Sequence, residues 1–261
     1  MSLGNKHDVL KTVFGFDDFR RGQEQIVDHL LDGKNSLAVM PTGAGKSLTY
    51  QVPALVKGGL SLVVSPLVAL MQDQVAALKL AGVNAASINS AQSRDENVRI
   101  WRAVAACEVP ILYLAPERLM PERMISALRK ISLSLIAIDE AHCISQWGAS
   151  FRPEYDALSQ LRTSFPNTPI AAVTATADEP TRQDIVQKIF GGTAEVYVAG
   201  FDRPNIRLAV RAKQRAKDQL LDLLDDHQGN SGIVYTLSRK SSEDYAEFLT
   251  SKGFNARAYH A

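Results

Sequence analysis

The chain has very little cysteine, no long apolar run and almost no net charge. Only Cys107 and Cys143 occur in 261 residues, too few for a disulfide framework or a four-cysteine zinc site. No apolar run approaches the roughly 18 residues of a membrane-spanning helix, and the opening MSLGNKHDVL lacks the apolar core of a signal peptide. These absences favour a reduced, cytoplasmic protein with no membrane partner and no zinc.

The formal net charge of +1 predicts no general affinity for nucleic acid, so any such binding must come from a local patch. One basic run, RPNIRLAVRAKQRAK at Arg203–Lys217, has six basic residues and no acidic one. A solvated linker face explains this run better than a phosphate-tracking patch does.

Apolar runs of strand length alternate with amphipathic runs of helix length, which predicts an α/β fold with a parallel sheet flanked by helices. The expected strands are residues 36–40, 60–65, 84–88, 111–114, 133–138, 170–174 and 194–198. The expected helices are residues 23–33, 47–57, 66–82, 96–106 and 180–190. One domain is therefore expected over residues 1–199.

The turn-rich segment GFDRPN, residues 200–205, is expected to be a linker. After it the alternation restarts, with IRLAV, GIVYT and NARAYHA as expected strands around two helical runs. Residues 206–261 are too few to complete a sheet, since such a domain usually needs about 100 residues or more. We therefore expect the beginning of a second domain and a truncated chain.

The strongest chemical signal is AVMPTGAGKSLTY, an apolar strand that runs through a glycine-containing turn into a helix. In a P-loop, small residues let backbone N–H groups surround phosphates, the lysine reaches the terminal phosphates and the serine binds magnesium. Met40 stands where the strict pattern has its first glycine, and the alternative is a glycine-rich turn with a surface lysine. The predicted phosphate-binding residues are Thr42, Gly43, Ala44, Gly45, Lys46 and Ser47.

A second signal is Asp139-Glu140-Ala141-His142, directly after the apolar run LSLIAI. Ligands gather at the carboxyl ends of parallel strands, so this acidic pair and the P-loop are expected to converge. Asp139 would hold Mg²⁺ together with Ser47, and Glu140 would orient or deprotonate an attacking water. Taken alone, the pair is better explained as a helix N-cap, and the P-loop elsewhere in the chain favours the catalytic interpretation.

The segment CISQWGASFRPEY, Cys143–Tyr155, crowds aromatic residues into a loop that lacks the period of a helix or a strand. Trp147 and Phe151 offer faces on which bases stack, and Arg152 can pair with phosphate. For Tyr155, packing of the loop onto its own domain is at least as good an explanation.

Taken in order, FGFDDFRRGQEQIV, MPTGAGKS, VVSPLVALMQDQV, YLAPERL, DEAHCISQWG, AVTATAD and FDRPNI resemble the motifs of RecQ-type DNA helicases of superfamily 2. The resemblance implies RecA-like domains and an enzyme that couples Mg-ATP hydrolysis to 3′–5′ movement on single-stranded DNA. It further implies unwinding of forked DNA at the bacterial nucleoid, with protein partners unspecified.

The resemblance also assigns roles to single residues. Phe16, Arg20 and Gln23 would form the adenine pocket, although FGFDDF alone reads equally well as a hydrophobic staple. Catalysis would fall to Lys46, Asp139 and Glu140. The residues implied in DNA binding or coupling are Trp147, Phe151, Arg152, Ser65, Gln72, Glu117, Arg118, Thr174, Thr176 and Arg239.

Two departures from the family pattern qualify these expectations. Ala149-Ser150 stands where relatives usually carry His-Asp, which puts the coupling of DNA to the nucleotide site in question. The arginines that a second domain supplies to the terminal phosphate would lie beyond Ala261, so we expect nucleotide binding with weak turnover. The alternatives are a nucleotide- and DNA-binding module without helicase activity, or a P-loop ATPase that acts on a protein.

Overall fold

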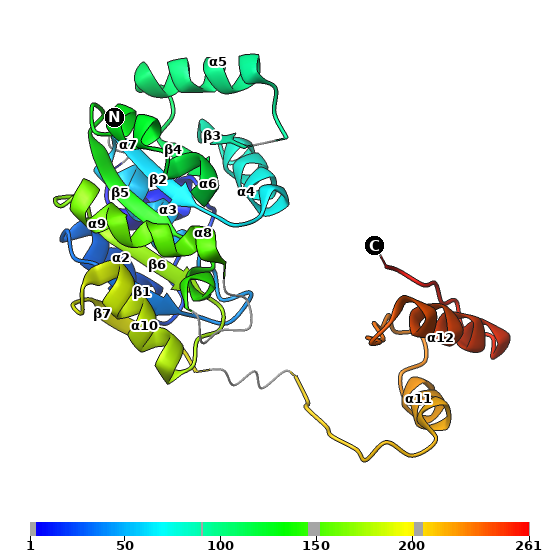
Figure 1. The fold of residues 1–261 in the computed structure, drawn as a ribbon. Helices are drawn as coiled ribbons and strands as arrows, with labels where there is room; N and C mark the ends of the chain where they lie inside the picture. The colour runs from blue at the N-terminus through cyan, green and yellow to red at the C-terminus, as the bar shows by residue number, and fades with distance from the viewer. Residues whose placement is uncertain (1–3, 90, 146–151, 201–205, 261) are drawn as a thin grey trace. The chain divides into compact units, whose positions relative to one another are not determined.

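The computed structural model describes residues 4–89, 91–145, 152–200 and 206–260 (Figure 1). The chain divides into two compact units, Met1–Asp202 and Arg203–Ala261. Each unit is described by itself below.

The first unit is built on a seven-stranded sheet in the order β3-β4-β2-β5-β6-β1-β7. All of its strand pairs are parallel. The strands are β1 Ser36–Val39, β2 Leu60–Val64, β3 Ala85–Ile88, β4 Ile111–Leu114, β5 Leu133–Ile138, β6 Ile170–Thr174 and β7 Glu195–Val198. Every strand expected before residue 200 is present, and the predicted RecA-like α/β fold is confirmed.

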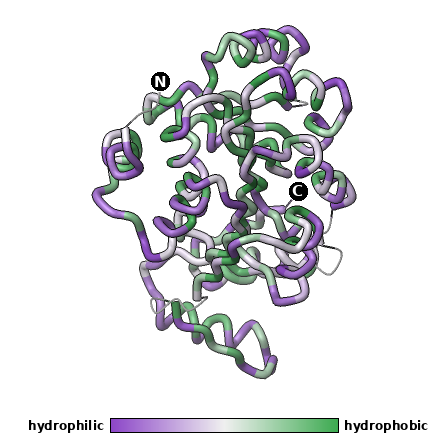
Figure 2. The backbone as a smooth tube through the Cα atoms, turned by 90° about the vertical axis from the view of Figure 1, so that its left-hand side faces the viewer, coloured by the Kyte–Doolittle hydropathy of each residue, from purple (hydrophilic) through white to green (hydrophobic). Residues whose placement is uncertain are grey.

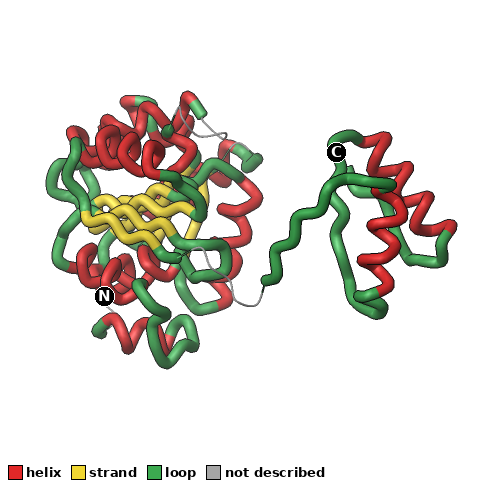
Figure 3. The backbone as a smooth tube through the Cα atoms, turned by 90° about the horizontal axis from the view of Figure 1, so that it is seen from below, coloured by secondary structure: helices red, strands yellow, loops and turns green. Residues whose placement is uncertain are grey.

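Helices cover both faces of this sheet (Figure 3). The α-helices are α1 Lys6–Thr12, α2 Gln23–Leu31, α3 Leu48–Lys57, α4 Val68–Leu80, α5 Arg94–Ala105, α6 Pro116–Leu119, α7 Glu122–Leu128, α8 Pro153–Asp156, α9 Leu161–Ser164 and α10 Glu179–Phe190. Two short 3₁₀ helices, η1 Ala141–Ile144 and η2 Ala157–Gln160, lie among them. All five helices expected in this unit form.

Local sequence signals explain where these helices begin and end. The Ser93 side chain accepts a hydrogen bond from the backbone N–H of Glu96 at the start of α5. Asp178 caps α10 in the same way, and α10 ends at Gly191 in the left-handed conformation that favours glycine.

Successive strand residues point to opposite faces of the sheet and fill two separate cores. Leu37 and Val39 of β1 belong to the core beneath α5, α7 and α10. Ala38 of the same strand belongs to the core formed with α1, α2, α3 and α4. Hydrophobic segments accordingly gather in the interior in Figure 2, and β1, β2, β3, β4 and β6 are buried along their whole length, as expected for a parallel sheet covered on both faces.

The second unit contains two helices, α11 Ala216–Asp225 and α12 Arg239–Ser251. The prediction of strands at IRLAV, GIVYT and NARAYHA is wrong for residues 206–260, where no strand forms. Their apolar composition favours an extended chain, but a strand also requires a hydrogen-bonded neighbour, and these segments have none. Leu208 and Val210 are consequently 90% and 100% exposed.

Among the described residues, no helix is long and apolar enough to cross a membrane.

The fully buried Leu62 of the interior strand β2 provides a test of the core. We expect Leu62→Ala to lower the free energy of unfolding by about 2–5 kcal/mol, because it removes apolar contacts and leaves a cavity. Leu80 is 90% exposed, so Leu80→Ala should change it by less than about 0.5 kcal/mol. Urea denaturation followed by circular dichroism measures both, and equal effects would contradict this description of the core.

Candidate active site

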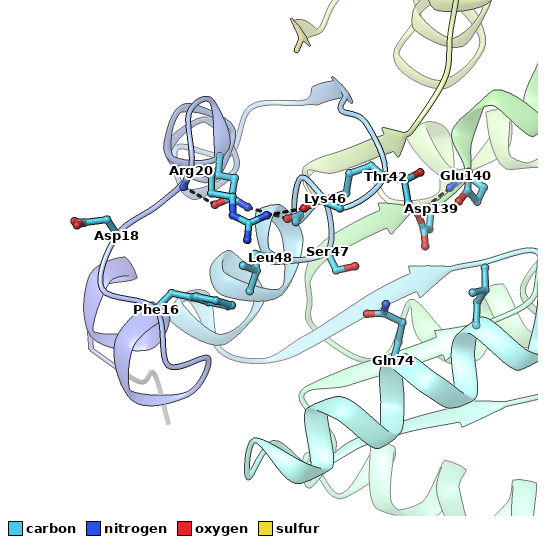
Figure 4. A pocket seen from close by; sticks show the side chains of 14 residues that line it. Phe16, Asp18, Arg20, Thr42, Lys46, Ser47, Leu48, Gln74, Asp139 and Glu140 are labelled. Atoms are coloured by element: carbon cyan, nitrogen blue, oxygen red, sulfur yellow. Dashed lines mark hydrogen bonds between the residues drawn. The ribbon is translucent and has the colours of Figure 1, made fainter. Parts of the chain in front are cut away.

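The P-loop and the acidic pair line one cavity of about 410 Å³ in the first unit (Figure 4). This volume is typical of small-molecule sites. Ten residues that the sequence analysis singled out lie on its wall: Phe16, Arg20, Gln23, Thr42, Gly43, Gly45, Lys46, Ser47, Asp139 and Glu140. Asp18, Leu48, Leu70 and Gln74 also line it and were not anticipated.

The order of the strands explains the convergence. The P-loop follows β1, the acidic pair follows β5, and β6 lies between these two strands. Parallel strands have their carboxyl ends at one edge of the sheet. Residues almost 100 positions apart in the sequence therefore meet there.

The P-loop has the backbone geometry of an anion-binding turn. Gly43 and Gly45 have φ angles of +84° and +78°, which glycine adopts at little cost. A Cβ on Gly45 would lie 2.4 Å from Nε2 of Gln23, so any other residue here would displace the Gln23 amide from the loop. The loop leads into α3, and the free N–H groups and dipole of a helix N-terminus favour anions.

The Lys46 ammonium donates a hydrogen bond to the carbonyl of Met40 at 3.3 Å. The lysine thus folds back onto the beginning of its own loop. A bound anion would compete with this carbonyl for the ammonium.

The segment before α2 is hydrogen-bonded to the P-loop. Arg20 Nη1 donates to the carbonyl of Gly43 at 2.5 Å, and Gln23 Nε2 donates to those of Ala44 and Gly45 at 3.0 Å each. Gln23 Oε1 accepts from the backbone N–H of Arg20 at 2.8 Å. Gln23 is buried, so the side chain expected to read a base braces the loop in this conformation.

Phe16 is 45% exposed and lies on the cavity wall. Its ring is therefore open to a ligand and not packed as a hydrophobic staple would be. In Figure 4 it lies beside Arg20 and away from Asp139. This end of the cavity suits a planar base.

Glu140 has a φ of +50° and introduces η1. Left-handed backbone is unusual for glutamate and is characteristic of functional sites. The turn lets the backbone N–H of Glu140 donate to Asp139 Oδ1 at 2.9 Å. Both carboxylates consequently border the cavity.

Burial raises the pKa of Asp139 to about 6, and the negative charge of Glu140 acts in the same direction. The positive charge of Lys46 and the hydrogen bond from Glu140 oppose this rise only in part. At neutral pH the carboxylate is therefore a buried anion with incomplete compensation. A cation would stabilise it.

The oxygen atoms of Ser47 and Asp139 fit Mg²⁺, which prefers hard oxygen ligands. No cluster of three or more acidic, histidine or cysteine ligands occurs in the described ranges. Mg²⁺ commonly takes one or two protein ligands and completes its shell with water and phosphate oxygens.

His142 joins the acidic pair to β6, a connection that the sequence analysis missed. Its Nδ1 lies 2.8 Å from the Thr174 hydroxyl and 3.3 Å from Glu140 Oε2. Thr174 is buried, and its hydroxyl also lies 3.1 Å from the carbonyl of the exposed Thr176. The sequence feature that could have predicted this role is His142 itself, because it follows Asp139 and Glu140 directly after an apolar strand.

Two residues that follow the segment 146–151 bond back to the first unit. Arg152 Nη1 donates to the carbonyl of Pro66 at 3.1 Å, and its backbone N–H donates to the carbonyl of Cys143 at 2.9 Å. The buried Tyr155 donates its hydroxyl to the carbonyl of Asp139 at 3.1 Å. Tyr155 thus packs α8 onto its own unit. Trp147 and Phe151, with Ala149-Ser150, lie outside the described residues.

The remaining predicted residues do not line the cavity. Ser65 is buried, and its hydroxyl has no hydrogen-bond partner within the described ranges. Gln72 of α4 and the α6 residues Glu117 and Arg118 are exposed. Arg239 is exposed at the first position of α12 in the second unit.

The raised pKa of Asp139 predicts how stability changes with pH. The folded carboxyl binds its proton more tightly than the unfolded one, so without metal the wild-type free energy of unfolding should fall as pH rises from about 4 to 6. Asp139→Asn should therefore be more stable than wild type at pH 7, by about 2–3 kcal/mol. Denaturant titrations at several pH values with a chelator measure this difference.

The matched control is Asp178, whose pKa is lowered by its hydrogen bonds to Thr181. Its contribution to stability is present at neutral pH and is lost on acidification, so Asp178→Ala should destabilise the chain at pH 7. If Asp139→Asn were also less stable than wild type there, our account of the buried carboxylate would be wrong.

Comparison with known proteins places this site in a family. Residues 20–185 match the DEAD/DEAH box helicase family. The chain is 46% identical over 254 residues to ATP-dependent DNA helicase RecQ of Pasteurella multocida, covering 97% of this chain and 40% of that protein. RecQ of Haemophilus influenzae is 45% identical over 253 residues, with 97% and 41% covered. The chain thus spans about two fifths of the length of these relatives.

Among solved structures, the helicase MrfA bound to DNA and AMPPNP aligns with a TM-score of 0.73 at 18% identity, covering 96% of this chain and 38% of that one. A hypothetical ATP-dependent RNA helicase from Sulfolobus tokodaii aligns at 0.60 and 22% identity, covering 93% and 71%. These structures support the fold alone. The sequence matches confirm the resemblance to RecQ-type helicases, and the chain belongs to the DEAD/DEAH box helicase family.

Proposed function

We propose that this chain forms the nucleotide-binding part of an ATP-dependent DNA helicase that moves 3′–5′ along single-stranded DNA and unwinds forked duplexes at the nucleoid. The observation that carries the proposal is the single cavity in which a P-loop, an acidic pair and an open aromatic ring meet. Relatives named as ATP-dependent DNA helicases support the substrate pair.

The cavity suggests one role for each group. Phe16 stacks on the base, while the P-loop N–H groups and Lys46 bind the phosphates. Ser47 and Asp139 would hold Mg²⁺, which supplies positive charge to the phosphate oxygens. Glu140 orients the attacking water and accepts its proton.

The contacts on the far side of the acidic pair support coupling to DNA. Trp147 and Phe151 would stack on bases, and the exposed Gln72, Glu117, Arg118 and Arg239 would contact the backbone without reading its sequence. The Ser65 hydroxyl is buried, so Ser65 is not proposed as a DNA contact. Arg152 and Tyr155 connect the loop to Pro66 and Asp139. If DNA binding moves Trp147 and Phe151, this connection would pass the movement to Asp139, whose carboxylate is proposed to hold the metal.

Turnover by this chain alone is proposed to be weak. Arg20 is the single arginine among the described residues that line the cavity, and its guanidinium is bonded to Gly43 at the base end. No arginine among them faces the acidic pair, where one contributes roughly 10³–10⁵ to phosphoryl transfer. If the chain binds ATP tightly but shows no detectable ATP hydrolysis, the alternative of a nucleotide- and DNA-binding module is favoured.

Lys46→Ala tests the nucleotide site. Loss of the ammonium should weaken ATP binding by at least tenfold, because a hydrogen bond to a charged group contributes about 1.5–3 kcal/mol. Lys34→Ala is the control, since Lys34 is an exposed lysine outside the cavity. Titration with a fluorescent ATP analogue measures both, and unchanged affinity in Lys46→Ala would remove the P-loop assignment.

Trp147→Ala and Phe151→Ala test whether the aromatic segment Cys143–Tyr155 binds single-stranded DNA. Each should weaken binding of single-stranded DNA by about 1–3 kcal/mol per stacked base at fixed salt, with ATP affinity unchanged. Phe16→Ala should do the reverse, because it removes the ring at the base end. Fluorescence anisotropy with a labelled oligonucleotide measures the DNA affinity. Full DNA affinity in both loop variants would favour a protein partner for this surface.

A further inference from the structure

Gln74 of α4 lines the nucleotide cavity, although the motif in which it lies drew attention to Gln72 instead. Gln72 is exposed, two positions earlier on the same helix. Helical geometry turns residues two apart toward different sides. The helix thus presents Gln74, and not Gln72, to the cavity.

A buried neighbour fixes the orientation of the Gln74 side chain. Gln51 of α3 is 5% exposed, and its Nε2 donates to Gln74 Oε1 at 3.0 Å and to the Tyr113 hydroxyl at 3.0 Å. Tyr113 is fully buried in β4. Because the oxygen of Gln74 is the acceptor, its NH₂ group remains as a donor that is not engaged by any described residue.

The position of Gln74 along the cavity determines which part of a bound nucleotide its NH₂ group can contact. In Figure 4 Gln74 extends from α4 on the side of Ser47 and Asp139, while Phe16 and Arg20 lie at the opposite end. A nucleotide with its base at Phe16 and its phosphates on the P-loop would direct its last phosphate toward Gln74. The acidic pair beside it repels an anion, so a neutral N–H donor is favourable there.

We infer that Gln74 binds the terminal phosphate of ATP, and that Gln51 is its positioning residue. The inference rests on the proposed function, because it assigns a further residue to the same nucleotide site. Its consequence is discrimination between the triphosphate and the diphosphate, since ADP has no group at this end of the cavity.

The same helix adds a connection to the DNA side. α4 begins at Val68, two residues after Pro66, whose carbonyl accepts the hydrogen bond from Arg152. Gln74 therefore lies on the helix that directly follows the residue contacted by Arg152. Binding of the terminal phosphate and the position of Arg152 would bias the same rigid element.

The test compares Mg²⁺ with AMPPNP and Mg²⁺ with ADP, titrated calorimetrically against the full chain. Gln74→Leu should weaken AMPPNP binding about tenfold, as expected for loss of a hydrogen bond to a charged oxygen, and should leave ADP binding within about twofold. Gln74→Glu should weaken AMPPNP further, because it keeps the acceptor for Gln51 but places a negative charge beside the phosphate.

Two other variants complete the test. Lys79→Gln, an exposed position on the same helix, should bind both nucleotides as wild type does. Gln51→Leu should lower AMPPNP affinity less than Gln74→Leu, because it frees the Gln74 side chain without removing its donor. Thermal denaturation checks that each variant is folded. If Gln74→Leu does not fold, the AMPPNP and ADP affinities of Gln74→Glu, which is isosteric with wild type, replace it in the test.

The outcomes separate this inference from the proposed function. Equal losses for AMPPNP and ADP, or no loss in either Gln74 variant, would overturn the inference and leave the nucleotide site standing. A wild-type chain that binds neither nucleotide would overturn the proposed function and the inference with it.

Discussion

The position of β6 between β1 and β5 is the constraint on which the site depends. The backbone N–H of Met40 donates to the carbonyl of Thr174 at 2.9 Å, so the P-loop leaves the sheet from a point fixed by β6. On its other side the Thr174 hydroxyl contacts His142. One residue at the end of a buried strand thus connects the P-loop to the segment that carries the acidic pair.

The acidic pair shows how the fold sets chemical properties that composition cannot. Asp139 follows four successive buried residues of β5, and its carboxyl group is itself largely shielded from water. Desolvation makes its charge unfavourable until a cation arrives. Glu140 leaves the direction of the strand through its left-handed turn, and its side chain is 27% exposed.

The sequence predicted the sheet of the first unit well because each strand is a short apolar run between turn residues, and burial on both faces imposes that pattern. It predicted that Lys46, Asp139 and Glu140 would lie in one cavity because they follow strands whose carboxyl ends share an edge. It failed for the second unit, where IRLAV and GIVYT have strand composition but no neighbouring strand to pair with. It also missed Gln74 and His142, whose roles arise from contacts with Gln51 and Thr174 that no local pattern encodes. The hydrogen bonds by which Gln23 holds the P-loop also join residues far apart in the sequence, so no local pattern predicted them.

Met40 stands where the strict P-loop pattern has glycine, and its side chain is buried in the core formed with α1, α2, α3 and α4. The loop therefore begins at a residue that is anchored by a thioether in the core and by a backbone hydrogen bond to β6. Its glycines occur only later, at Gly43 and Gly45. The loop is therefore held at both ends of its glycine-containing turn: Met40 is fixed in the hydrophobic core, and the carbonyls of Gly43, Ala44 and Gly45 accept hydrogen bonds from Arg20 and Gln23. An incoming anion would meet a turn whose shape is already set.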